Sequence, residues 1–184
     1  MANKKILNIN GKEQVLTDEE IRLRDYQKMM NTVAQRASFY RANPHRFVKD
    51  YLNINLHIFQ QIILVMMNLS TNSMFLASRG IGKSFMLAVF CVVRCILYPG
   101  TMVVVTSKTR AQGYEIIDKI EKQLMPKSKL LQTEIDTKKS AFNLTKALVQ
   151  FRNGSYIQVV TANDNARHFR ANLLVDQLPV IMET

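Results

Sequence analysis

One eight-residue segment constrains this chain more than any other, namely Ala77-Ser78-Arg79-Gly80-Ile81-Gly82-Lys83-Ser84. It follows a short apolar run at residues 74–77, which predicts a strand, and it opens a long apolar run at residues 83–97, which predicts a buried helix. A glycine turn in this position directs backbone N–H groups and the helix N-terminus toward phosphate oxygens. The segment therefore predicts a phosphate-binding P-loop.

The residue types in the segment suit the triphosphate of ATP. Gly80 and Gly82 allow the backbone to turn sharply, and Ser78, Arg79 and Ile81 complete the loop. We expect Lys83 to pair with the β- and γ-phosphates and the Ser84 hydroxyl to coordinate Mg²⁺. The strict pattern has glycine at position 77, where this chain has alanine. The alternative interpretation is a glycine turn that opens an ordinary helix.

A second phosphate-site element is expected on a later strand, because Mg²⁺ needs a carboxylate from the carboxyl end of a neighbouring strand. Asp176 directly follows the apolar run at residues 173–175 and fits this role. A glutamate ordinarily comes next to activate water, but this chain has Gln177. An amide can orient a water molecule but cannot accept its proton, so a catalytic role here would lose about 10²–10⁴ in rate.

The pattern of elements predicts an α/β fold with a mostly parallel sheet and flanking helices. Helices are expected at residues 18–41, 44–51 and 57–69, so residues 1–55 read as an N-terminal helical segment and residues 56–184 as the core. Within the core, a strand at 102–106 precedes a helix at 109–124 that stops at Pro126. Apolar runs at 148–151 and 156–160 flank Asn153-Gly154, a strong hairpin signal.

The charge distribution points to a polyanionic partner. The formal net charge is +11, and residues 51–114 contain no aspartate or glutamate. Double-stranded DNA is the partner we predict, with solubilising charge as the alternative. No apolar run is long enough to span a bilayer, and the N-terminus does not resemble a secretion signal, so we expect a cytoplasmic protein. Cys91 and Cys95 read as buried thiols in a reducing compartment.

Several motifs together resemble the large terminase subunits that package DNA into the heads of tailed bacteriophages. Arg79 stands four residues before Lys83, as is frequent in that family, and two further segments match. These are Asn43-Pro44-His45-Arg46-Phe47 and Leu56-His57-Ile58-Phe59-Gln60. The resemblance implies a P-loop NTPase-like fold and a role for Gln60 in reading the adenine edge. The alternative for Gln60 is a polar residue on an exposed helix face.

The same resemblance implies a function and a set of partners. A terminase couples ATP hydrolysis to translocation of double-stranded DNA in a ring of subunits, together with a small terminase subunit and a portal ring. An arginine in the loop before the Asp176 strand reaches a neighbouring subunit's ATP site in that family, and Arg167 stands there. His168 occupies the usual glycine position. Arg170, or a solvated basic loop that touches DNA phosphate, is the alternative.

The departures from the family limit the activity we expect. Gln177 replaces the usual acid, and residues 178–184 do not resemble the usual continuation. We therefore predict an incomplete ATPase core with impaired hydrolysis and no nuclease activity, from a truncated, frameshifted or engineered gene. A helicase-like translocase fragment and a non-catalytic nucleotide- or DNA-binding remnant are the alternative readings.

Overall fold

The structure, a computed structural model, describes residues 4–9, 12–75, 80–161 and 171–177. The chain forms two compact units, Met1–Ala42 and Asn43–Thr184. The sequence placed the boundary between residues 55 and 56, whereas the structure groups the residues after Ala42 with the larger unit.

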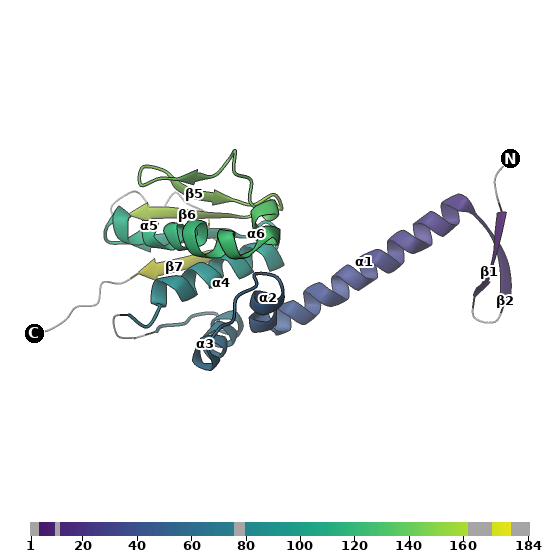
Figure 1. Cartoon of the computed structure of the whole chain (residues 1–184), viewed down its shortest axis with the longest axis horizontal. Coiled ribbons are helices and arrows are strands. Elements are labelled where there is room, and N and C mark those ends of the chain that lie inside the picture. Colours follow the sequence, from purple (N-terminus) through teal and green to yellow (C-terminus); the bar gives the residue numbers. More distant parts are fainter. Residues whose placement is uncertain (1–3, 10–11, 76–79, 162–170, 178–184) are drawn as a thin grey trace, which may run out of the picture. The chain divides into compact units, whose positions relative to one another are not determined.

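The first unit contains a hairpin and one long helix (Figure 1). Strands β1 (Lys4–Ile9) and β2 (Lys12–Thr17) pair antiparallel, and α1 (Asp18–Ala42) follows directly. The helix predicted at residues 18–41 is confirmed. The hairpin was not predicted, although Ile9 pairs with Lys12 across the two-residue sequence Asn10-Gly11.

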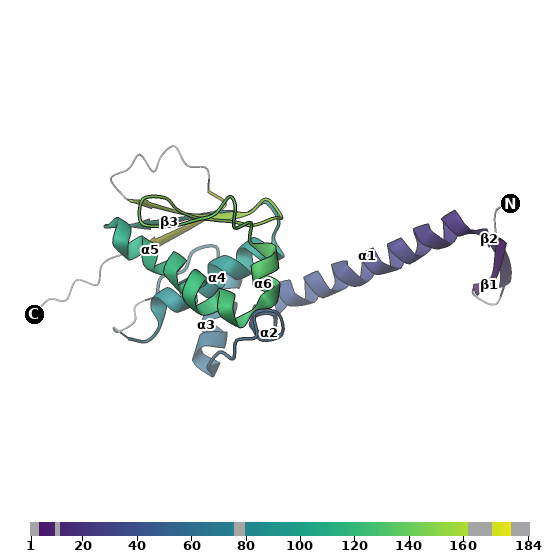
Figure 2. The same cartoon turned by 45° about the horizontal axis from the view of Figure 1, so that its top comes forward.

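The second unit is a five-stranded sheet with helices packed against it. In Figure 2, helices α4, α5 and α6 lie on one side of the sheet. The helices are α2 (Pro44–Asp50), α3 (Ile58–Leu69), α4 (Lys83–Leu97), α5 (Arg110–Lys119) and α6 (Lys129–Glu134). The strands are β3 (Met102–Ser107), β4 (Ala141–Phe142), β5 (Ala147–Gln150), β6 (Tyr156–Thr161) and β7 (Leu173–Gln177).

The sheet is mixed, with the order β4-β5-β6-β3-β7. β3 pairs parallel with both β6 and β7, whereas β4, β5 and β6 pair antiparallel. The α/β class with flanking helices is confirmed, and the parallel pairings join β6, β3 and β7 on one side of the sheet. The hairpin predicted around Asn153-Gly154 is confirmed as β5 and β6, with Gly154 at φ +87°.

The core lies between α4, α5 and the middle of the sheet. α4 is apolar on most sides, and nine of its residues are buried. α5 approaches the sheet closely at Gly113, where a Cβ would lie 2.5 Å from Val159 Cγ1 and 2.6 Å from Ser107 Oγ. A side chain at this position would therefore displace the helix from β3 and β6.

The two cysteines are confirmed as buried free thiols within α4. Burial raises the pKa of the Cys91 thiol to about 12 and raises that of Cys95 as well. Both side chains are therefore protonated small apolar groups at neutral pH.

Two predicted elements differ from the structure. Met74 and Phe75 are exposed and lie outside any strand, while residues 76 and 77 of the predicted strand fall outside the described residues. The helix predicted at residues 109–124 ends at Lys119 and continues as a π-helical turn (Ile120–Leu124) and a 3-10 turn (Met125–Lys127). Pro126 lies in this last turn, and its ring and missing N–H do not fit a regular α-helix.

Helix α1 is long enough to span a bilayer but too polar, and the apolar α4 is too short. No helix in the described part of the chain combines the length and apolar character that a membrane span requires.

Candidate functional site

The loop that precedes α4 has the backbone that its glycines allow. Gly80 and Gly82 have φ values of +90° and +88°, a left-handed region that other residues enter only with strain. Gly82 is the N-cap of α4 and, as a glycine, it makes no side-chain capping hydrogen bond. The first N–H groups of a helix have no partner inside it, and this end of a helix favours an anionic acceptor.

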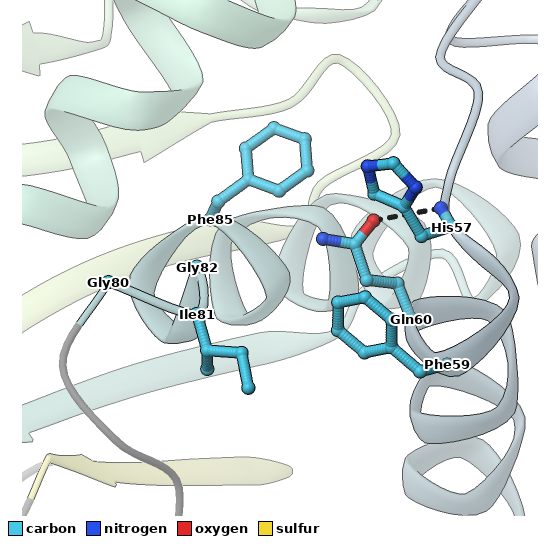
Figure 3. A pocket seen from close by; sticks show the side chains of 7 residues that line it. All are labelled: His57, Phe59, Gln60, Gly80, Ile81, Gly82 and Phe85. Carbon is cyan, nitrogen blue, oxygen red and sulfur yellow. Dashed lines mark hydrogen bonds between the residues drawn. The ribbon is translucent and has the colours of Figure 1, made fainter.

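A pocket of about 470 Å³ opens beside this loop (Figure 3). Its volume lies in the range of small-ligand sites. The pocket brings Gln60 together with three loop residues that the sequence assigned to nucleotide binding. Its lining residues are His57, Phe59, Gln60, Gly80, Ile81, Gly82 and Phe85.

Gln60 is held in one orientation by the start of its own helix. Its Oε1 accepts a hydrogen bond from the His57 backbone N–H at 3.0 Å. An N–H group needs an acceptor, so Oε1 faces His57 and the Nε2 donor faces the loop. Nε2 lies 3.8 Å from the position that a Cβ on Gly82 would take. Only 8% of Gln60 is exposed, which excludes the alternative of a polar residue on an exposed helix face.

Aromatic side chains give the pocket an apolar wall. The rings of His57 and Phe59 are stacked, with centroids 5.9 Å apart and an angle of 4° between their planes. A base placed between them would need about 7 Å, since each contact takes about 3.5 Å. A planar ligand would therefore contact the rings from outside the pair. His57 and Phe59 entered the sequence predictions only as parts of the segment at residues 56–60 and were not assigned to the site.

Asp176 lies at the carboxyl end of the parallel part of the sheet. It pairs in register with Thr106 of β3, and the Thr106 hydroxyl donates to Asp176 Oδ1 at 3.0 Å. The carboxylate is exposed. The Thr106 hydrogen bond orients one oxygen, and the exposed carboxylate keeps acceptor capacity for a cation. Thr106 was predicted only as the last residue of the strand at residues 102–106, with no role in the site.

Topology brings Asp176 to the same end of the sheet as the start of α4. Only four residues separate α4 from β3, so the helix runs back along the strand. The 15 residues of α4 and the 6 residues of β3 have similar lengths, about 22 and 20 Å. The first turn of α4, with Lys83 and Ser84, therefore lies at the end of the sheet where β3 and β7 finish. Both views show this arrangement (Figures 1 and 2).

The remaining predicted site residues stay predictions. Ser78, Arg79, Arg167 and the alternative Arg170 lie outside the described residues. Gln177 is the last residue of β7, and its backbone pairs in register with Ser107.

No known protein family and no curated protein matches this chain. Its function is therefore inferred from its own residues and their arrangement.

Proposed function

We propose that this chain is an ATP-binding P-loop domain, derived from the large terminase subunit of a DNA-packaging motor. The observation that carries the proposal is the pair of left-handed glycines before α4 together with Gln60, whose amide donor faces them. Such a loop suits phosphate oxygens, and an oriented donor a few ångströms away suits the edge of a base. A glycine turn that merely opens a helix does not require a buried glutamine beside it.

The chain's own residues divide the work of holding the nucleotide. The loop and the first turn of α4 offer backbone donors to phosphate, Lys83 offers a cation, and Gln60 Nε2 offers a donor to the base. The Ser84 hydroxyl and the Asp176 carboxylate are the oxygen ligands for Mg²⁺, and Thr106 keeps Asp176 oriented. When bound, Mg²⁺ neutralises charge on the β- and γ-phosphates.

Binding is tested by titrating the full chain with a fluorescent ATP analogue and Mg²⁺. We expect Lys83→Ala to lower the affinity by about 100-fold, because it removes the cation beside the phosphates. Lys138→Ala, in an exposed turn, removes the same charge and should leave the affinity unchanged. Equal affinities for both variants would contradict the proposed site.

A pair of substitutions separates the two roles of Gln60. Gln60→Glu keeps an acceptor for the His57 N–H but lacks the Nε2 donor, whereas Gln60→Ala loses both. Both should weaken nucleotide binding about tenfold. Gln60→Ala should also lower the free energy of unfolding, by about 1 kcal/mol, because it removes the cap of α3. Wild-type affinity in Gln60→Glu would show that Gln60 serves α3 alone.

In this proposal, the rate of ATP hydrolysis depends on the residue at position 177. An amide there can orient water but cannot take its proton, so the chain should bind ATP with little turnover. Gln177→Glu should raise the rate of phosphate release. Equal, vigorous hydrolysis in both proteins would overturn the assignment of this position. Arg79 and Arg167 belong to the same proposal as further cations for the transferred phosphate.

The polyanion partner we propose is double-stranded DNA, with the host cytoplasm as the location. The net charge of +11 and the acid-free stretch at residues 51–114 support it. Affinity for a duplex should fall steeply with salt and change when ATP is present. Salt-dependent binding without any effect of ATP would favour a non-catalytic remnant, and strand displacement would favour a helicase-like translocase. A small terminase subunit, a portal ring and a ring of copies remain part of the proposal for the parent motor.

A further inference from the structure

Helix α1 carries a line of apolar side chains along most of its length. Leu23, Tyr26, Met30 and Val33 are each between 45% and 57% exposed. In proteins, a helix draws most of its stability from packing of an apolar face rather than from the propensities of its residues. The exposed side chains therefore form a surface for a partner.

The spacing of these residues indicates the kind of partner. They belong to a stripe, here named the α1 stripe, in which apolar or aromatic residues alternate at intervals of three and four. Its members are Leu23, Tyr26, Met30, Val33, Ala37 and Tyr40. Intervals of three and four repeat every seven residues and keep side chains on one seam between two helices, as in a coiled coil. The α1 stripe therefore fits another helix.

The charges on α1 favour an antiparallel arrangement of two copies of the helix over a parallel one. The acidic residues of α1 all lie at or before Asp25, and the residues after it carry only basic charges. An antiparallel pair places the acidic start of each helix beside the basic end of the other. A parallel pair places Arg36 of one copy beside Arg41 of the other, which is repulsive.

We infer that α1 pairs with α1 of a second copy of this chain as an antiparallel two-helix coiled coil. The register that matches the two stripes places Leu23 opposite Tyr40, Tyr26 opposite Ala37, and Met30 opposite Val33, each pair occurring twice by symmetry. The same register sets Glu20 of each copy beside Arg41 of the other, a complementary pair at each end of the seam.

Met29 is an exposed apolar residue next to the α1 stripe, and the proposed register also covers its side chain. It comes beside Arg36 of the other copy, whose aliphatic stem can cover it while the charged end stays in water. Phe39 lies off the seam and is not covered by this pairing.

The first experiment measures the mass of the full chain by sedimentation from about 1 to about 100 µM. We expect a dimer that dissociates on dilution. Met30→Glu should weaken dimerisation on the order of 100-fold, because it places two carboxylates in the apolar seam. Asn31→Glu introduces the same charge one residue away, off the seam, and should leave the dimer intact. A monomer at every concentration, or equal effects of the two variants, would overturn the inference.

The second experiment tests the direction of the helices. Leu23→Cys and Tyr40→Cys proteins should form a disulfide with each other when mixed and oxidised, because the two positions lie opposite each other in this register. Cys91 and Cys95 are buried and should not take part. Neither variant should cross-link to itself, because identical positions at the ends lie about 25 Å apart in the antiparallel register. Self-cross-linking of Leu23→Cys would establish a parallel pair and reject the inference.

Exchanging the charges of Glu20 and Arg41 tests the register without changing any residue of the α1 stripe. Glu20→Arg or Arg41→Glu alone should weaken the dimer several-fold, because each brings like charges together. The double variant should restore the affinity. Additive weakening in the double variant would contradict the proposed register.

Discussion

The two ends of helix α4 are built in opposite ways. At its carboxyl end, the turn between β5 and β6 supplies side chains that satisfy the helix: Asn153 Nδ2 and the Ser155 hydroxyl donate to the Cys95 carbonyl at 2.7 and 2.9 Å. At its amino end, Gly82 brings no side chain to the first turn, and a pocket opens beside it. A helix end that the fold already satisfies is structural, whereas an end that opens on a pocket suits a ligand.

The Arg94 side chain adds to the closed end. Its guanidinium lies 4.2 Å from the centroid of the Tyr98 ring, at the last turn of α4. A cation in this position is favoured both by the ring face and by the negative end of the helix dipole. The open end has the reverse polarity, which favours an anion.

The largest effect should come from breaking the closed end. Ser155 is fully buried, donates to Cys95 O and accepts from the Thr101 N–H at 3.0 Å. Ser155→Ala leaves both groups without this partner and should lower the free energy of unfolding by about 3 kcal/mol. Urea denaturation measures this, with the exposed Thr133→Ala as a control of less than about 0.5 kcal/mol. Nucleotide affinity should not change, and a loss of affinity would mean that the two ends are coupled.

A smaller effect should separate the two ends through glycine. Gly82 and Gly100 flank α4 with φ values of +88° and +76°, and a Cβ would clash at neither position, since the nearest atom is Gln60 Nε2, 3.8 Å from a Cβ on Gly82. Alanine at either site should lower the free energy of unfolding by about 1–2 kcal/mol through backbone strain. Only Gly82→Ala should also weaken ATP binding. If Gly100→Ala weakened it equally, the open end would have no special role.

The middle of α4 should give an effect that is absent near neutral pH and is seen only as a dependence on alkaline pH. Burial raises the pKa of Cys91 from 9.0 to about 12, so the unfolded state releases its proton first as the pH rises. Stability is therefore retained below pH 9 and lost between pH 9 and 12, by about 1 kcal/mol per pH unit. The raised pKa of Cys95 acts in the same direction.

Denaturation at pH 8 and pH 10 measures this slope. Replacing both cysteines by alanine should flatten it, even though the substitutions also lower the stability at pH 8. An unchanged slope in that variant would assign the alkaline sensitivity to other groups, such as Tyr51, whose pKa burial also raises.

Elements bounded by strong local signals were predicted closely from the sequence. α4 and β3 are separated by Pro99-Gly100, and β5 and β6 by Asn153-Gly154, so both boundaries were found. Asn10-Gly11 is the same signal, but it was overlooked because the flanking residues 4–9 and 12–17 are rich in charge and amide groups. The π-helical turn before Pro126 could not be foreseen, since it reflects how α5 is packed as well as its sequence.

The candidate site was only partly predictable. The glycines and Gln60 were found from their motifs, and the structure brings them to one pocket. The capping bond from the His57 N–H, which fixes the Gln60 amide, depends on where α3 begins to within one residue. The contact between Thr106 and Asp176 depends on the register of strands far apart in the chain, which no local pattern encodes.

Strand β3, which lies between β6 and β7, has a consequence for how the protein is made. Both of its partners come later in the chain: Met102 pairs with Tyr156, 54 residues on, and Val103 pairs with Leu173. At about 5–20 residues per second, a ribosome needs roughly 3–11 s to deliver the first partner. During that interval the β-branched segment at residues 102–107 has no ladder to join. Synthesis speed and chaperone access should therefore affect the yield of folded protein.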